Sequence, residues 1–355
     1  MWKGENNIMK YFWKKKTIVS YLLSVFVFLI HISSISNYKN SGGFISVVNN
    51  FLEIFFKRTI TSYAVVLFFI LSGVLFFRNY DKTMYFDKIK SRIKTLAIPF
   101  LIWNVIWMFF EIVTSYTFLS SYFIGREKFE ITVSNVLNAI FHYGCNGPFW
   151  FIFELFFFVI ITPIIDKIIK NKYIGFSVAL VILILSQFDI GLPSPLFYSK
   201  EAISYYILGG IIGKHFWEKF SMKSSGKIQW ISVIGVIICT IYTYFRISLQ
   251  FEILILIHKI LNLSYAFFFW YSMDMFIDKM RMYEFYSHSF AVFAMHVNVS
   301  AIVSKLYYII LPKTPHFAII NFVLTIASTL LIINIFCLLL RRFFPKLNAI
   351  LMGMR

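Results

Sequence analysis

Long apolar runs recur along the whole chain, and they constrain the fold more than any other feature of the sequence. The hydrocarbon layer of a bilayer is about 30 Å thick, so a helix of about 20 apolar residues can cross it. In lipid the backbone polar groups of such a run must pair with one another, which favours helices. We therefore predict an all-α polytopic membrane protein in which residues 1–355 form one integral membrane domain. About ten transmembrane helices are expected, at residues 17–36, 59–77, 95–113, 149–166, 173–188, 202–214, 228–245, 254–277, 288–311 and 317–340.

Composition agrees with a membrane class. The chain is 59% hydrophobic and only 14% charged, whereas soluble domains carry about a quarter charged residues. A net charge of +18 could suggest nucleic acid, but the basic residues lie between the apolar runs, so no nucleic-acid partner is expected. Cys145, Cys239 and Cys337 are far apart and form no metal spacing or disulfide framework. We expect no metal.

The basic residues also predict the orientation. With a cytoplasmic N-terminus, 24 of the 34 Lys and Arg residues fall in cytoplasmic segments, as the positive-inside rule requires. Both termini are therefore predicted to be cytoplasmic, in a bacterial inner or plasma membrane. The N-terminal basic and apolar region has no small-residue cleavage site, which indicates an uncleaved helix. The basic C-terminal tail, residues 341–355, suits anionic lipids of the inner leaflet, so membrane lipids are expected partners.

His31 is the most informative polar residue of the first span. At about 1.5 Å of rise per residue it lies roughly 21 Å along from Thr17, inside the apolar layer. An ionisable group there is costly unless it faces the protein interior or a wet cavity, so it is a functional candidate by default. The alternative is a neutral histidine at the outer interface that is bonded to a carbonyl. The pattern favours neither.

Other polar residues lie in or beside the predicted spans. Glu154, a few residues past Trp150, needs a partner, which Arg58 or His31 could supply. His296 in the ninth span suggests a wet interior, although a satisfied core histidine is the alternative. Arg58 could otherwise be an interfacial residue whose head reaches water.

Three further polar features can be explained by packing or by solvation, without a functional role. The pair Ser72 and Gly73 could be a small-residue packing notch in the second span. Glu111 is expected to reach water near the outer end of the third span. Asp274 and Asp278 are expected to be ordinary charges at the inner end of the eighth span.

The most basic inner segment precedes the third span. If the third helix continues inward, Lys88 and Arg92 share a face at i, i+4, with Lys94 beside them. Such a cluster can hold a polyphosphate through charge and bidentate arginine contacts. Setting the topology and touching anionic lipid would explain the same charges. A nucleotide-binding glycine loop, a paired-cysteine zinc site and a G-x-S-x-G elbow do not occur in the sequence.

Five stretches in order carry a resemblance: VFVFLIHISS, AVVLFFILSGVLFF, SRIKTLAIPFLIW, GPFWFIFELFFFVIITPII and SFAVFAMHVNV. Together they resemble the membrane-bound acyltransferase 3 family over most of the chain. Two positions depart from the pattern. Ser20 occupies the place eleven residues before His31 where the family often has Arg or Lys, and Val66 stands where the family usually has proline.

The resemblance implies transfer of an acyl group, most often acetyl, from cytoplasmic acyl-CoA to a hydroxyl of a cell-surface glycan or its lipid-linked precursor. This would be O-acetylation of a cell-envelope polysaccharide, with acetyl-CoA as the donor. His31 matches the key histidine of the family, and Arg92 and Lys94 match its donor-side cluster.

The expected site combines these residues. His31 acts as general base, and Ser72, Arg58 and Glu154 assist catalysis. Lys88, Arg92 and Lys94 bind the donor, and Trp150 and His296 contact the substrate. The alternative from another class is a transporter or flippase of a lipid-linked saccharide, which would use the same buried groups as a polar path. A polysaccharide polymerase is a third option.

Overall fold

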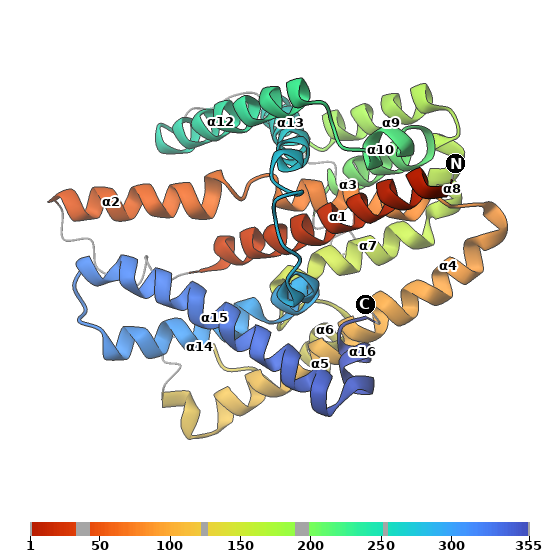
Figure 1. The fold of residues 1–355 in the computed structure, drawn as a ribbon. Helices are drawn as coiled ribbons and strands as arrows, with labels where there is room; N and C mark the ends of the chain where they lie inside the picture. The colour runs from red at the N-terminus through yellow and green to blue at the C-terminus, as the bar shows by residue number, and fades with distance from the viewer. Residues whose placement is uncertain (1, 33–42, 122–126, 189–198, 251–254, 354–355) are drawn as a thin grey trace. The chain divides into compact units, whose positions relative to one another are not determined.

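The computed structural model describes residues 2–32, 43–121, 127–188, 199–250 and 255–353. Every regular element in these ranges is helical (Figure 1). The principal helices are α1 (Trp2–His31), α2 (Gly43–Glu53), α3 (Ala64–Phe77), α4 (Tyr85–Arg92), α5 (Ile98–Tyr116), α6 (Val133–Phe141), α7 (Trp150–Ile160), α8 (Thr162–Ile169), α9 (Lys172–Leu185), α10 (Ala202–His215), α11 (Trp217–Ser221), α12 (Gly226–Ser248), α13 (Ile255–Ser272), α14 (Ser289–Ile310), α15 (His316–Phe343) and α16 (Pro345–Leu351).

The chain divides into two compact units. The first contains Met1–Asp81 and Pro163–Asn334, and the second contains Lys82–Thr162 and Ile335–Arg355.

Nine of the ten predicted apolar runs lie mostly within one helical segment of the structure, although the end of the first, residues 33–36, lies outside the described residues. The run predicted at 149–166 is instead divided between α7 and α8. In the part of the chain that the structure describes, five helices are long and apolar enough to cross a membrane: Gly43–Phe77, Lys82–Tyr116, Gly226–Ser248, Glu284–Ile310 and His316–Phe343. A sixth span results if Gly147–Ile160 and Thr162–Ile169, which are bent by 70° at their junction, count as one. The ten-helix count and the cytoplasmic termini stay predictions, since length and composition alone do not settle them.

Two of the long helices contain a wider, π-helical turn. In the run Gly43–Phe77 this turn is η1 (Ile54–Thr59), and in the run Lys82–Tyr116 it is η3 (Ile93–Ala97). A π turn changes the angular phase of the residues that follow it, and such turns are frequent at functional sites. The residues on either side of each turn therefore do not share the faces that a regular helix would give them.

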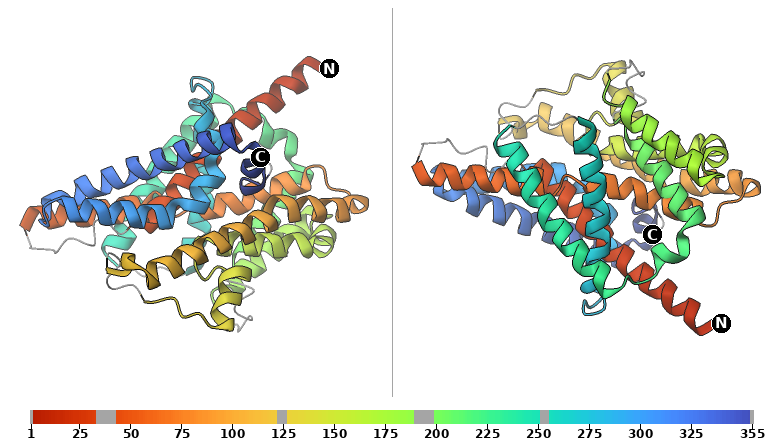
Figure 2. Two further views of the ribbon diagram at one scale, coloured as in Figure 1. Left: turned by 90° about the horizontal axis from the view of Figure 1, so that it is seen from below. Right: turned by 90° about the horizontal axis from the view of Figure 1, so that it is seen from above.

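In the first unit, α3 and α10 pack backbone against backbone. A Cβ atom on Gly73 would lie 2.3 Å from the carbonyl oxygen of Tyr206, and one on Gly209 would lie 2.1 Å from that of Ile70. The packing notch predicted at Gly73 is therefore present, because only glycine permits this approach. Helices α12 and α13 pack side by side in the same unit (Figure 2).

The N-terminal half of α1 is tied to the first unit by a buried carboxylate. Asp274 lies at the end of α13, and its Oδ1 is 2.6 Å from Lys15 Nζ and accepts a hydrogen bond from the Tyr11 hydroxyl at 2.5 Å. Its Oδ2 accepts from the Ser224 amide and hydroxyl at 3.0 and 2.7 Å. The expectation of an ordinary helix-end charge is wrong for Asp274, because three hydrogen bonds and one ion pair enclose it within the fold.

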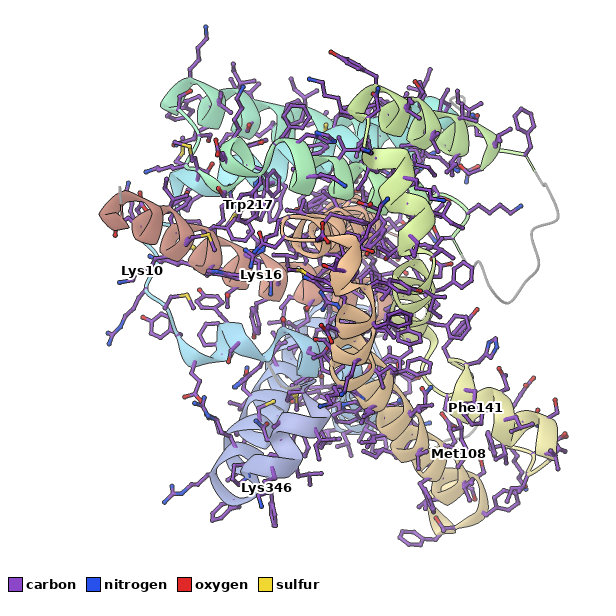
Figure 3. The ribbon with its side chains drawn as sticks, turned by 90° about the vertical axis from the view of Figure 1, so that its right-hand side faces the viewer. Lys10, Lys16, Met108, Phe141, Trp217 and Lys346 are labelled. Carbon is purple, nitrogen blue, oxygen red and sulfur yellow. The ribbon has the colours of Figure 1, made fainter. Side chains whose placement is uncertain are left out.

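Aromatic rings surround this ion pair. Lys15 Nζ lies 4.1 Å from the ring centroid of Trp270, and Phe12 packs at 4.7 Å against Trp217, which lies beside α1 (Figure 3). Burial lowers the pKa of Lys15 to about 8, while the charge of Asp274 acts in the opposite direction. The N-terminal basic region is therefore part of the folded core as well as a topology signal.

In the second unit, α5 carries α6 and α16. The Asn104 amide donates to the carbonyls of Ile140 and His142 at 3.1 and 2.5 Å. The Trp103 indole donates to the Leu351 carbonyl at 3.1 Å. The C-terminal segment is thus a helix held against α5, and its Lys346 remains exposed (Figure 3). Contact with lipid headgroups at this tail stays a prediction.

Candidate functional site

The end of α1 places His31 against α14. The ring centroids of His31 and His296 are 5.3 Å apart, although 265 positions separate the two residues in the sequence. The His296 side chain is 0% exposed, whereas His31 is exposed. The His31 ring therefore lies beside a buried imidazole of the first unit, and its role as a base stays a prediction.

His296 is held in one tautomer by its own helix. Its Nδ1 lies 2.9 Å from the carbonyl oxygens of Val292 and of Phe293. A carbonyl only accepts, so Nδ1 carries the hydrogen and the neutral ring presents Nε2 as an acceptor. Nε2 is buried and has no hydrogen-bond partner in the described ranges. His296 is thus only half satisfied by the core, and one ring nitrogen is open to a proton donor.

An apolar shell supports the two imidazoles. Phe28 packs against the His296 ring at 5.8 Å between centroids. The same phenylalanine belongs to a buried cluster with Leu29 of α1, with Ile32 directly after α1, and with Ala318 and Phe322 of α15. Because such surroundings have a low effective dielectric constant, charges and dipoles near the buried His296 ring act strongly on it.

Lys57, in the π turn η1, is the basic residue that is electrostatically coupled to His31. The charge of Lys57 acts on the His31 imidazole, and its ammonium pairs with Glu53 at 3.0 Å. Arg58, the residue predicted from the sequence, is exposed and makes no hydrogen bond or ion pair with any residue in the described ranges. Sequence reasoning missed Lys57 because both residues lie in the π turn η1, where helical periodicity does not tell which one faces α1.

Ser72 lies in α3 and is half-buried. It directly precedes Gly73, which makes the close backbone contact with α10. The described residues give Ser72 no hydrogen bond to His31. Its assisting role is untested and stays a prediction.

The predicted donor-binding residues lie in the second unit. Lys88 and Arg92 belong to α4 and share a face one helical turn apart, as the helical continuation before the third predicted span requires. The cytoplasmic location of this segment stays a prediction. Both are half-buried, and Lys94 lies exposed in the π turn η3 that follows. The basic cluster therefore lies on a continuous helix that leads into α5, with Pro99 in the first turn of that helix.

Two carboxylates of the second unit are buried. Glu154 in α7 is 1% exposed and lies one turn after Trp150, so the two share a helical face. Glu111 in α5 is also buried, which corrects the expectation that it reaches water. Helix α6 packs against α5, so part of the α5 surface is covered by protein.

A metal site is not evident in the ranges that the structure describes, where no three His, Cys, Asp or Glu side chains gather as ligands.

Comparison with known proteins identifies the class. Residues 21–347 match the profile of the acyltransferase domain of the acyltransferase 3 type, which covers nearly the whole chain. The chain therefore belongs to the acyltransferase 3 family and is a membrane-associated acyltransferase. No curated protein and no solved structure matches the chain.

Proposed function

We propose that the protein transfers an acyl group, most simply acetyl, from cytoplasmic acyl-CoA to a hydroxyl of a cell-surface glycan or its lipid-linked precursor. The proposal rests on one observation in a chain of this family. The exposed His31 ring, at the end of α1, lies 5.3 Å from the ring of the buried His296, whose Nε2 has no hydrogen-bond partner among the described residues.

His31 is the proposed general base. In its neutral form it accepts the proton of the acceptor hydroxyl, while the hydroxyl oxygen attacks the thioester carbonyl. The tetrahedral intermediate collapses, the carbon–sulfur bond breaks, and the imidazolium returns its proton to the leaving thiolate. Base and acid are therefore the same ring, and no metal is required by the proton balance.

Lys57 supplies the electrostatic part of this proposal. The Lys57 ammonium, whose charge acts on His31, is proposed to stabilise the oxyanion that develops on the thioester carbonyl. His296, with its tautomer set by two carbonyls, offers an acceptor that can orient the acceptor hydroxyl or the His31 ring. Ser72, Arg58 and Glu154 keep the assisting roles proposed from the sequence.

The donor is proposed to bind through its phosphates. Lys88, Arg92 and Lys94 are three cations on one helical run, and arginine matches phosphate oxygens with two parallel hydrogen bonds. Trp150 is a proposed contact for the substrate in the same unit.

The function is tested in membranes that contain the protein. On addition of acceptor glycan, we expect acetyl-CoA to release free CoA and the glycan to gain one acyl mass increment. His31→Ala should lower the rate by about 10²- to 10⁴-fold, the usual contribution of a general base. His316→Ala, at an exposed histidine at the start of α15, is the matched control and should keep the rate.

Two results would contradict the proposal. A His31→Ala variant that acylates at the normal rate would refute the base role. Wild-type membranes that move a lipid-linked saccharide but release no CoA would instead favour a transporter or flippase.

A further inference from the structure

A second feature of the first unit lies apart from the histidine pair. An apolar pocket of about 580 Å³ lies among α9, α10, α11 and α13, within the usual size range of small-molecule sites. It is lined by aliphatic and aromatic side chains with one cation and one phenol: Phe176, Ala179, Leu180, Leu183, Leu208, Ile212, Phe216, Lys219, Phe220, Ile260, Leu263, Phe267 and Tyr271. None of these residues belongs to the proposed acyl-transfer site.

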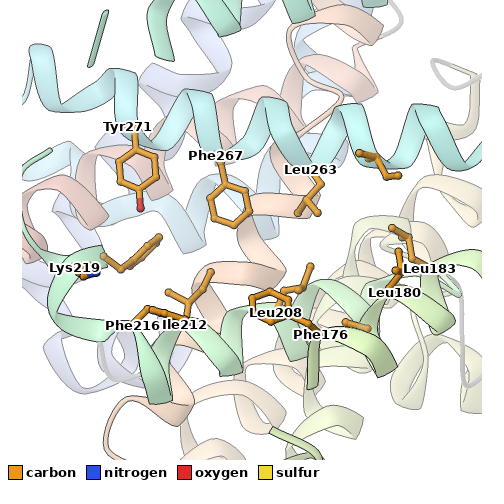
Figure 4. Close-up of a pocket in the computed structure, with 13 residues that line it drawn as sticks. Phe176, Leu180, Leu183, Leu208, Ile212, Phe216, Lys219, Leu263, Phe267 and Tyr271 are labelled. Atoms are coloured by element: carbon orange, nitrogen blue, oxygen red, sulfur yellow. The ribbon is translucent and has the colours of Figure 1, made fainter. Parts of the chain in front are cut away.

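The pocket is polar at one end only. Figure 4 shows Lys219 and Tyr271 at one end and Leu180 and Leu183 at the other. Lys219 is exposed and has no hydrogen bond or ion pair among the residues that the structure describes. A second ammonium is near the same end, because Lys172 Nζ lies 5.7 Å from the ring centroid of Phe216.

The apolar part opens toward the outside of the helices. Phe176 and Leu180 on α9 are 43% and 50% exposed. In a membrane protein the medium around such a surface is the hydrocarbon of the lipid tails. A hydrocarbon chain can enter an apolar opening there, whereas a sugar or a nucleotide would lose the hydrogen bonds that its polar groups make with water. The occupant must therefore be mostly hydrocarbon.

The charges at the polar end of the pocket indicate the head group of the bound molecule. No carboxylate lines the pocket, and both lysines fall in segments with the basic excess predicted for the cytoplasmic side. We propose that this pocket binds one acyl chain of an anionic glycerophospholipid, whose phosphate contacts Lys219 and Lys172. This inference is independent of the proposed acyl transfer.

The test is native mass spectrometry of the full-length protein with two lipids of identical acyl chains, phosphatidylglycerol and phosphatidylcholine. We expect wild-type protein to retain one phosphatidylglycerol in preference to phosphatidylcholine. Lys219→Gln should reduce that preference about fivefold, the effect of removing one lysine near an anionic lipid. Leu208→Trp, which fills the pocket wall, should reduce binding of both lipids.

The matched control is Lys227→Gln, an exposed lysine at the start of α12 that does not line the pocket, and it should keep the preference. Thermal melting of each variant separates loss of lipid from loss of fold. Equal preference in Lys219→Gln and wild-type protein would overturn the proposal. A copurified polyisoprenyl phosphate in place of a glycerophospholipid would overturn it as well, since that mass would assign the pocket to an acceptor carrier.

Discussion

At the scale of residues, the site depends on which ring nitrogen of His296 already makes hydrogen bonds. Both hydrogen-bonding contacts of His296 use Nδ1 and run to its own helix. Its Nε2 is left for another partner, and the His31 ring is the titratable neighbour at 5.3 Å. A histidine that was packed only as a core residue would have no reason to keep an open acceptor in an apolar shell.

The neighbouring cations Lys57 and Arg58 allow a matched test at this scale. We expect Lys57→Gln to lower the turnover of acyl transfer by about 10²-fold, the cost of losing one stabilising group at an oxyanion. Arg58→Gln also removes one positive charge, at the next position in the chain. It should leave turnover nearly unchanged, because the Arg58 side chain is exposed. CoA release and glycan mass measure both variants. A larger loss in Arg58→Gln would return the oxyanion role to Arg58.

At the scale of elements, the contact between α3 and α10 depends on glycine. Gly209→Ala would place Cβ 2.1 Å from the Ile70 carbonyl oxygen, and backbone atoms cannot move aside as a flexible side chain can. We expect a loss of about 1–3 kcal/mol in the free energy of unfolding, as for other overpacked sites. The lower melting temperature of purified protein would measure it.

Gly226→Ala is the control for this substitution. Nothing lies within 4 Å of the Cβ position at Gly226, in the first turn of α12. Alanine is the better helix former by about 1 kcal/mol, so the melting temperature should stay the same or rise. Equal melting temperatures for Gly209→Ala and wild-type protein would show that the two helices can separate at little cost.

At the scale of the whole molecule, the ion pair between Lys15 and Asp274 joins segments 259 residues apart within the first unit. Removal of one partner leaves a buried charge, and we expect Lys15→Met to cost about 3–5 kcal/mol in stability. The double variant Lys15→Met with Asp274→Asn should recover much of that loss. If the double variant were as unstable as Lys15→Met alone, the uncompensated charge would not be the cause.

The same lysine predicts a pH dependence of stability. Burial lowers the pKa of Lys15 to about 8 in the folded protein, against 10.5 in the unfolded chain. Between these values the unfolded chain binds more protons, so stability should rise with pH from about 8 upward. The measurement should be made below pH 10. Burial and Asp274 raise the pKa of Tyr11 in the folded protein, so above pH 10 the titration of Tyr11 makes stability fall with rising pH. Lys15→Met should lack the rise that the wild-type melting temperature shows.

Much of the element pattern was predictable from local information. Helix formation in an apolar run needs only residues a few positions apart, and for this reason the described parts of the predicted runs are mostly helical, although the run 149–166 is bent by 70° between α7 and α8. The motif order likewise identified the family that the comparison shows. Burial of Asp274 was not predictable, because its four donors come from α1 and from the segment before α12.

The sequence by itself determined that this protein is helical, apolar and an acyltransferase 3 family member, since hydropathy and ordered motifs are properties of the linear chain. Only the tertiary structure decided that His31 faces His296 and that Lys57, in place of Arg58, acts on it. Both facts depend on helix phase and on contacts between segments far apart in the chain. A π turn alters that phase, and packing sets those contacts, so neither can be read from residue spacing.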